Sequence, residues 1–228
     1  MGGLGAALVA ELLIYGAAFI CGIVTAALIT ITQGEFGSRC VLYGRGTWNI
    51  STGSYRLETR GSDSLCGFIS TSSVFIALYC FSSISYFIYA GCLEEGQRSR
   101  RWLKVLLPVS GVFLFLLLVC GCLVRVGLNA FCHSLILESG ITSCSEAEKK
   151  NWTSQYNGSR FYTNFTHAET AVWVNLFLWV LVLALLIRES WKDSGETLLS
   201  AADPEWSTSE SEPLFTPKPR LPRSEEHT

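Results

Sequence analysis

The chain has 228 residues, of which 49% are hydrophobic and only 16% are charged, and its formal net charge is −2. A soluble domain of this size usually carries about 25% charged residues, whereas here no charged residue occurs between Asp63 and Glu94. This composition excludes a soluble nucleic-acid-binding protein, which would carry a basic stripe, and a large soluble enzyme core, and it indicates a small protein that crosses a membrane several times.

Four apolar stretches are long enough to be membrane-spanning helices. A helix rises about 1.5 Å per residue, so crossing about 30 Å of hydrocarbon takes roughly 20 apolar residues. The stretches that reach or approach this length are 12–32, 68–90, 105–124 and 170–188. Residues 1–11 form a short N-terminal segment with no basic residue and no convincing cleavage site, so the first stretch is expected to be a retained signal anchor rather than a cleaved signal peptide.

One face of the first helix carries small residues at a spacing of four. Ala18, Gly22 and Ala26 fall in line on that face, where small side chains let a neighbouring helix approach closely. In the fourth helix, Asn175 is expected to make an interhelical hydrogen bond. These four are the predicted helix-packing residues. Whether the neighbouring helix belongs to the same chain or to a second copy stays open, as does the alternative that the small residues face lipid.

The loop at 91–104 predicts the orientation of the chain. It holds four basic residues, which are Arg98, Arg100, Arg101 and Lys104. Cytoplasmic loops carry an excess of Lys and Arg, so this loop is expected in the cytosol. Both termini are then cytosolic, and the loops at 33–67 and 125–169 face the lumen or the cell exterior.

Sequons for N-glycosylation support the same orientation. Four asparagines stand in N-x-[ST] sequences, and these are Asn49, Asn151, Asn157 and Asn164. All four fall in the two loops assigned to the outside, so a membrane glycoprotein is predicted. Asn164 is the weakest of the four because it lies close to the fourth span.

The cysteines give a third line of evidence. Cys40 and Cys66 lie in the first outer loop, and Cys132 and Cys144 lie in the second. In an oxidising compartment such even numbers indicate disulfides. Three connectivities are open, of which the two within-loop pairs are favoured because each loop then closes on itself; four free thiols are the alternative. Cys92, at the cytosolic end of the second span, is a candidate for S-palmitoylation or an inert thiol.

The tail at 189–228 is rich in proline and acidic residues and is predicted to be disordered. Glu210, Leu214 and Phe215 approximate an acidic dileucine sorting signal that cytosolic sorting adaptors would bind. Ser207 and Ser209 each have Glu three residues later, which makes them candidates for acidophilic kinases. The alternative is a solvated tail with chance matches.

No catalytic constellation is recognisable. The three histidines are scattered, and no metalloprotease, nucleophile-elbow or P-loop motif occurs. We therefore expect no enzyme, no catalytic or metal-binding residue and no cofactor. Polar residues at membrane depth are also few. Glu11 and Asn175 are the candidates for a transport path, while Arg125 is expected to snorkel from the end of the third span.

Several short segments resemble one known family. They are 32–44 (TQGEFGSRCVLYG), 143–147 (SCSEA), 161–162 with 168–170 and 173–176, and 203–207 (DPEWS). Together they are similar to the transmembrane protein 179 family over nearly the whole chain. The resemblance implies a multi-pass membrane protein with no established biochemical activity, and it implies no catalytic residue. Claudins carry Gly-Leu-Trp before a cysteine pair in their first loop, and Trp48 lacks that context, so the sequence does not indicate a claudin.

The sequence therefore predicts an all-α tetraspan membrane protein: a four-transmembrane-helix bundle with two disulfide-closed extracytoplasmic loops and a disordered cytosolic tail. The predicted function is that of a non-enzymatic glycoprotein, a scaffold or trafficking component of the plasma membrane or of endosomal or secretory vesicle membranes. Its expected partners are the lipid bilayer, other membrane proteins or second copies, and sorting adaptors, but not nucleic acid. The alternative is a subunit of a small-solute or ion channel or transporter that uses Glu11 and Asn175.

Overall fold

The computed structural model describes residues 2–59, 62–92 and 100–202. The elements in chain order are α1 (Gly2–Glu35), β1 (Arg45–Asn49), β2 (Ser54–Thr59), α2 (Asp63–Cys92), α3 (Arg100–Ser139), α4 (Cys144–Ala147) and α5 (Phe161–Ala202). Within this described part, four helices are long and apolar enough to cross a membrane, over Val9–Glu35, Asp63–Tyr89, Val105–Ser139 and Phe161–Trp191. The predicted four-helix membrane fold is confirmed.

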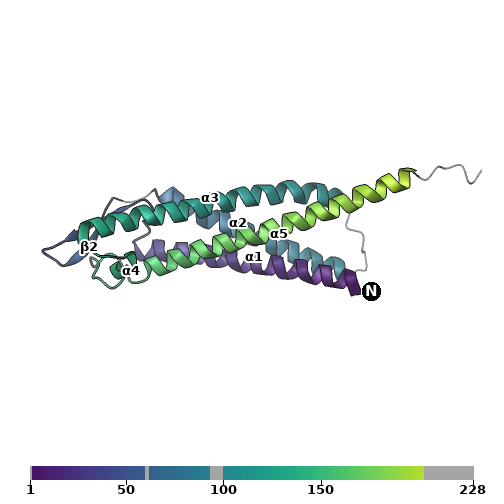
Figure 1. The fold of residues 1–228 in the computed structure, drawn as a ribbon. Helices are drawn as coiled ribbons and strands as arrows, with labels where there is room; N and C mark the ends of the chain where they lie inside the picture. Colours follow the sequence, from purple (N-terminus) through teal and green to yellow (C-terminus); the bar gives the residue numbers. More distant parts are fainter. Residues whose placement is uncertain (1, 60–61, 93–99, 203–228) are drawn as a thin grey trace, which may run out of the picture. The chain divides into compact units, whose positions relative to one another are not determined.

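The chain divides into two compact units, residues 1–188 and 189–228. In the first unit α1, α2, α3 and the first part of α5 run alongside one another, and the strands and α4 gather at the end away from the N-terminus (Figure 1). In the second unit α5 continues through Ala202, so the helix extends past the predicted span end at 188, and the rest of the predicted tail lies outside the described residues. The stretch before Pro204 is free of proline and contains good helix formers such as Leu198 and Ala201.

The helices extend beyond the predicted spans on the side of the outer loops. The predicted third span ends at 124, whereas α3 continues to Ser139 and has 40 residues. Its length of about 60 Å is twice the thickness of the hydrocarbon core. Buried Leu128, Phe131 and Leu135 continue the helical repeat of apolar residues after Arg125. Helix α3 is therefore longer than a membrane span requires, and it also contacts β1 and α4.

A β-hairpin replaces irregular chain in the first outer loop. Strands β1 and β2 pair antiparallel, with Trp48 opposite Tyr55 and Asn49 opposite Ser54. Gly53, at φ 61°, closes the turn and donates its N–H to the Asn49 carbonyl at 2.9 Å. A positive φ of this kind is readily adopted by glycine. The all-α prediction missed this small sheet.

One tryptophan joins the four membrane helices. The ring of Trp179 on α5 lies with its centroid 4.8 Å from that of Phe113 on α3. It is 6.0 Å from the rings of both Tyr15 on α1 and Tyr79 on α2. Such tilted and edge-to-face aromatic pairs contribute about 0.5–1.5 kcal/mol beyond their buried area. The bundle is therefore held together at its centre by contacts within a single chain.

Candidate functional site

Each outer loop is closed by its own disulfide. Cys40 is bonded to Cys66 at the start of α2, and Cys132 on α3 is bonded to Cys144 on α4. The Cys40 N–H also donates to Asp63 Oδ1 at 3.0 Å, so the first residue of α2 helps to hold the loop. The predicted within-loop connectivity is confirmed.

The two loops that the sequence predicts to be outer loops form one structure, which we call the outer module after that prediction (residues 36–59 and 126–160). The Tyr55 N–H on β2 donates to the Asn151 carbonyl at 2.9 Å, and the Thr153 N–H donates to the Tyr55 carbonyl at 3.0 Å. The Tyr55 ring packs against Trp48 at 4.8 Å and against Trp152 at 5.1 Å between centroids. A segment of the second loop thus extends the hairpin of the first, which the sequence reasoning did not anticipate.

Close backbone approaches fix the outer module to α3. A Cβ on Gly127 of α3 would lie 2.9 Å from Leu42 Cβ and 2.9 Å from the Tyr43 ring, so only glycine fits without a shift. The Tyr43 N–H donates to the Gly127 carbonyl at 3.2 Å, and Tyr43 itself adopts φ 60°. Left-handed backbone of this kind is costly for a residue with a side chain and persists only where its surroundings hold it. The loop before β1 is therefore held against α3.

Two grooves open on the outer module. The first, between β1 and α3, has a volume of about 540 Å³ and is lined by Tyr43, Arg45, His133, Leu137 and Glu138, among others. The second, beside β2 and the second loop, has a volume of about 890 Å³ and a more polar lining. Its lining residues include Arg39, Asn49, Arg56, Asn151 and Tyr156. The first groove holds two exposed apolar side chains, Tyr43 and Leu137.

The four sequons differ in their surroundings. Asn49, Asn151 and Asn157 are exposed. The Oδ1 atoms of Asn49 and Asn157 each accept a bond from the N–H two residues later, at 2.9 and 3.3 Å. These bonds use the oxygen and not the nitrogen to which a glycan attaches. Asn164 is different, because it lies inside α5 and its Nδ2 donates to Thr32 Oγ1 of α1 at 3.2 Å.

The small-residue face of α1 lies against α2 of the same chain. A Cβ on Gly22 would be 3.0 Å from the Ser73 carbonyl oxygen and 3.1 Å from Ala77 Cβ. Ala18 and Ala26, one turn to either side, are buried. The neighbouring helix that the sequence left open is therefore α2.

Asn175 is buried in the bundle, but its carbonyl is not bonded. Its side chain is 1% exposed, and no described residue donates a hydrogen bond to its Oδ1. One turn later on α5, Trp179 is also 1% exposed, and its Nε1 lacks a partner among the described residues. An unpaired buried polar group costs about 1–3 kcal/mol. The interhelical bond expected of Asn175 is thus not made by its oxygen.

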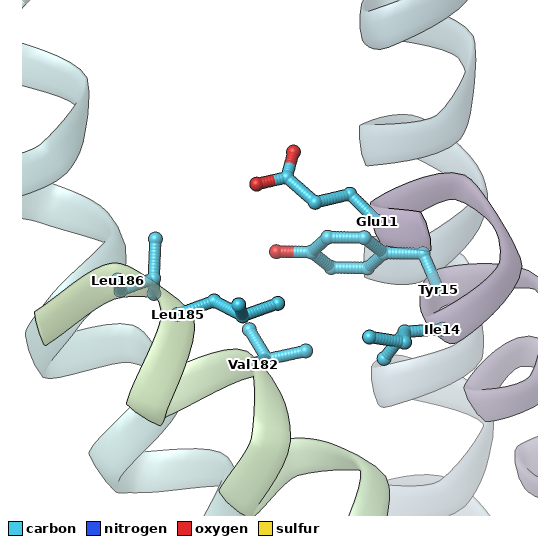
Figure 2. A pocket seen from close by; sticks show the side chains of 6 residues that line it. All are labelled: Glu11, Ile14, Tyr15, Val182, Leu185 and Leu186. Carbon is cyan, nitrogen blue, oxygen red and sulfur yellow. The ribbon is translucent and has the colours of Figure 1, made fainter. Parts of the chain in front are cut away.

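Glu11 faces a very small pocket between α1 and α5. Its carboxylate, Tyr15 and Ile14 point toward Val182, Leu185 and Leu186 across the gap (Figure 2). The pocket has a volume of about 10 Å³, which is about enough for one water molecule. It offers no room for a larger solute.

Arg125 forms an ion pair that the sequence reasoning missed. Its Nη1 lies 3.1 Å from Glu169 Oε1 and 3.4 Å from Oε2, joining α3 to α5. The Arg125 side chain is 62% exposed and the Glu169 side chain only 11%. Arg125 begins and Glu169 ends the loop predicted at 125–169. Because α3 and α5 both extend into that predicted loop, the two side chains come into contact.

The described residues hold no group of three or more His, Cys, Asp or Glu side chains that could bind a metal ion. The Cys92 side chain lies outside the residues that are described at this level of detail. The other predicted tail sites are also outside the described residues, namely Ser207, Ser209, Glu210, Leu214 and Phe215.

Comparison with known proteins gives a consistent relationship. Residues 7–215 match the family model described as the transmembrane protein 179/179B claudin domain. The chain is 46% identical to transmembrane protein 179B of Danio rerio over 210 residues, covering 91% of this chain and 94% of the relative. It is 42% identical to the Homo sapiens protein of that name over 200 residues, and 40% identical to the Mus musculus protein over 199; each match covers 87% of this chain and 90% of the relative. No solved structure matches.

The match confirms the resemblance and corrects one inference. The family model is described as a claudin domain, so the absence of a Gly-Leu-Trp motif around Trp48 did not exclude a relationship to claudins. The small sheet that carries Trp48 depends on contacts with the second outer loop, and a short motif does not detect such contacts.

Proposed function

The chain belongs to the transmembrane protein 179/179B claudin-domain family of multi-pass membrane proteins, and from that premise we propose that it acts without catalysis, as a glycosylated scaffold that binds membrane-protein partners through its outer module. The observation that carries the proposal is the outer module itself. Two loops far apart in the sequence are closed by separate disulfides and joined by backbone bonds to Tyr55. A fixed surface of this kind suits binding, because little conformational entropy is lost when a partner binds.

The groove between β1 and α3 is the partner surface in this proposal. It combines the exposed apolar side chains of Tyr43 and Leu137 with the charges of Arg45 and Glu138. Protein interfaces typically combine apolar and aromatic side chains at the core with a polar rim. The expected occupant is another membrane protein or a second copy of this chain.

Glycosylation belongs to the proposal at three of the four sequons. Asn49, Asn151 and Asn157 are exposed, whereas the amide nitrogen of Asn164 is engaged with Thr32. Glycans on the outer module, together with the basic loop at 91–104, favour cytosolic termini. The membrane would be the plasma membrane or that of endosomes or secretory vesicles, with sorting adaptors bound through the tail.

Transport is the competing function, and two features weigh against it. Asn175 is enclosed between helices rather than lining a path, and the pocket at Glu11 has a volume of only about 10 Å³. The proposal therefore expects the double substitution Glu11→Gln with Asn175→Leu to leave both ion flux and partner binding unchanged. Loss of an ion-dependent signal in proteoliposomes with partners retained would favour transport and overturn the scaffold proposal.

Glycan mapping tests the glycoprotein part directly. The full chain is expressed in animal cells, treated with peptide N-glycosidase and run on a denaturing gel. Asn49→Gln, Asn151→Gln and Asn157→Gln should each remove one step of the mobility shift, while Asn164→Gln serves as the matched control and should remove none. No shift in the unsubstituted protein would overturn the glycosylation and the orientation that rests on it.

Partner binding is tested in the groove between β1 and α3. Leu137→Gln removes its most exposed apolar side chain without creating an N-x-[ST] sequence, and Lys149→Gln, at an exposed position outside that groove, is the control. Cross-linking at the cell surface followed by purification should recover partners with the control but fewer with Leu137→Gln. Equal recovery would overturn this groove as the partner surface.

A further inference from the structure

Arg125 lies where the hydrocarbon ends on α3. Exposed apolar side chains face outward along this helix from Val105 to Val126. From Val105 to Arg125 the helix rises about 30 Å, which equals the thickness of the hydrocarbon core of about 30 Å. With Val105 at one boundary, Arg125 therefore lies at the level of the lipid headgroups on the side of the outer module.

The ion pair with Glu169 uses only part of the Arg125 guanidinium. Both carboxylate oxygens of Glu169 bond to the single nitrogen Nη1. Among the described residues, the hydrogen bonds of this guanidinium are the two to Glu169. The remaining N–H donors belong to a side chain that is 62% exposed. At the headgroup level water and lipid phosphate can both accept from these donors, and the phosphate is the anionic acceptor, which binds a guanidinium through charge-assisted hydrogen bonds.

A tryptophan lies one turn deeper on the same side of the α3–α5 contact. Gly121 precedes Arg125 by four residues and Trp173 follows Glu169 by four, so each pair shares a helix face. A Cβ on Gly121 would lie 3.2 Å from the Trp173 ring, which places this ring directly against α3. Trp173 is 38% exposed, and tryptophan is enriched at membrane interfaces.

We propose that Arg125 and Trp173 form a phospholipid-binding site in the leaflet next to the outer module. Arg125 donates its free N–H groups to the phosphate, because guanidinium groups bind phosphate through charge-assisted hydrogen bonds. Trp173 packs against the glycerol and upper acyl region of the same lipid. Glu169 balances the charge of Arg125, so the site holds a phosphate that is anchored by acyl chains rather than a free anion.

Native mass spectrometry of the full chain tests this site. The protein is released from nanodiscs that contain equal amounts of dioleoyl-phosphatidylcholine and a phosphate-free galactolipid with the same acyl chains. The measured quantity is the ratio of the two lipids retained on the protein. Arg125→Gln with Glu169→Gln removes both charges and leaves no unpaired buried carboxylate. It should lower the preference for phosphatidylcholine about fivefold, as expected for the net loss of one hydrogen bond to the phosphate.

Two further variants separate lipid binding from a purely structural role. Glu169→Gln alone frees the guanidinium and should raise the preference for phosphatidylcholine, an effect in the opposite direction. Arg56→Gln, an exposed arginine on β2, is the control and should change nothing. An unchanged ratio in the double variant, or a lowered ratio in Glu169→Gln, would overturn the proposal. Displacement of the lipid by millimolar inorganic phosphate would also overturn it, because the site would then bind a free anion.

Discussion

Asn175→Leu should stabilise this protein, although it removes a polar residue from a buried helix contact. Asn175 Oδ1 is buried without a partner, and an unpaired buried acceptor costs about 1–3 kcal/mol. Leucine has the same number of side-chain heavy atoms and the same branch point, but its methyl groups are bulkier and cost about 1 kcal/mol of overpacking. The net expectation is a gain of about 1 kcal/mol, or about fivefold in the folded-to-unfolded ratio.

The assay is unfolding by sodium dodecyl sulfate in mixed micelles, followed by circular dichroism. The matched control is Asn164→Leu on the same helix, because Asn164 donates to Thr32 at 3.2 Å. Breaking that bond should cost about 0.6 kcal/mol or more, so the two identical substitutions should act in opposite directions. A loss of stability in Asn175→Leu as large as that in Asn164→Leu would refute the argument and indicate that the Asn175 carbonyl has a bonding partner in the membrane.

Three other changes test the packing and the outer module. Gly22→Val should lower the free energy of unfolding by about 1–3 kcal/mol, because a Cβ at this position already lies 3.0 Å from the Ser73 carbonyl oxygen. A Cβ at Gly16 on the same helix meets nothing within 4 Å. Gly16→Val should therefore be tolerated in the same unfolding assay. Replacing Cys132 and Cys144 by serine opens a loop of sequence separation 12 and should cost about 3 kcal/mol, measured against the intact protein without reductant. Trp152→Leu removes the ring that packs on Tyr55 and Phe36 and should loosen the contact between the two loops. The measurement is the rate of proteolysis within 36–59, which should rise. An unchanged rate would show that the backbone bonds to Tyr55 are enough to hold the loops together.

The membrane part of the fold follows from the sequence, because the bilayer imposes a simple requirement. Backbone groups in hydrocarbon have to be bonded within the segment, so a sufficiently long apolar stretch becomes a helix. The prediction failed at the outer ends of these helices. Hydropathy falls at Arg125, but the helix continues because Leu128, Phe131 and Leu135 are buried within the outer module. A helix can continue beyond its membrane-spanning part, and hydropathy detects only the membrane-spanning part.

The disulfides were predictable and the surface they enclose was not. Four cysteines allow three connectivities, and Cys40–Cys66 with Cys132–Cys144 is favoured because each loop then closes on itself. The hairpin has a local signal in the Ser51-Thr-Gly53 turn between alternating residues. The segment of the second loop that extends the hairpin has no local signal, because the bonds of Tyr55 to residues 151 and 153 join parts of the chain about a hundred residues apart. Non-local pairing of this kind leaves no periodicity in either segment.

The distribution of sequons then limits where partners can bind, if the glycans are present as proposed. Asn49 and Asn151 line the larger, more polar groove, whereas no sequon residue lines the groove between β1 and α3. An N-linked glycan is bulky and hydrated, so two of them at one groove would keep proteins away from that side. The exposed Tyr43 and Leu137 lie on the other groove, where an apolar contact remains accessible. The glycans and the apolar side chains therefore favour the same face for partner binding, for independent physical reasons.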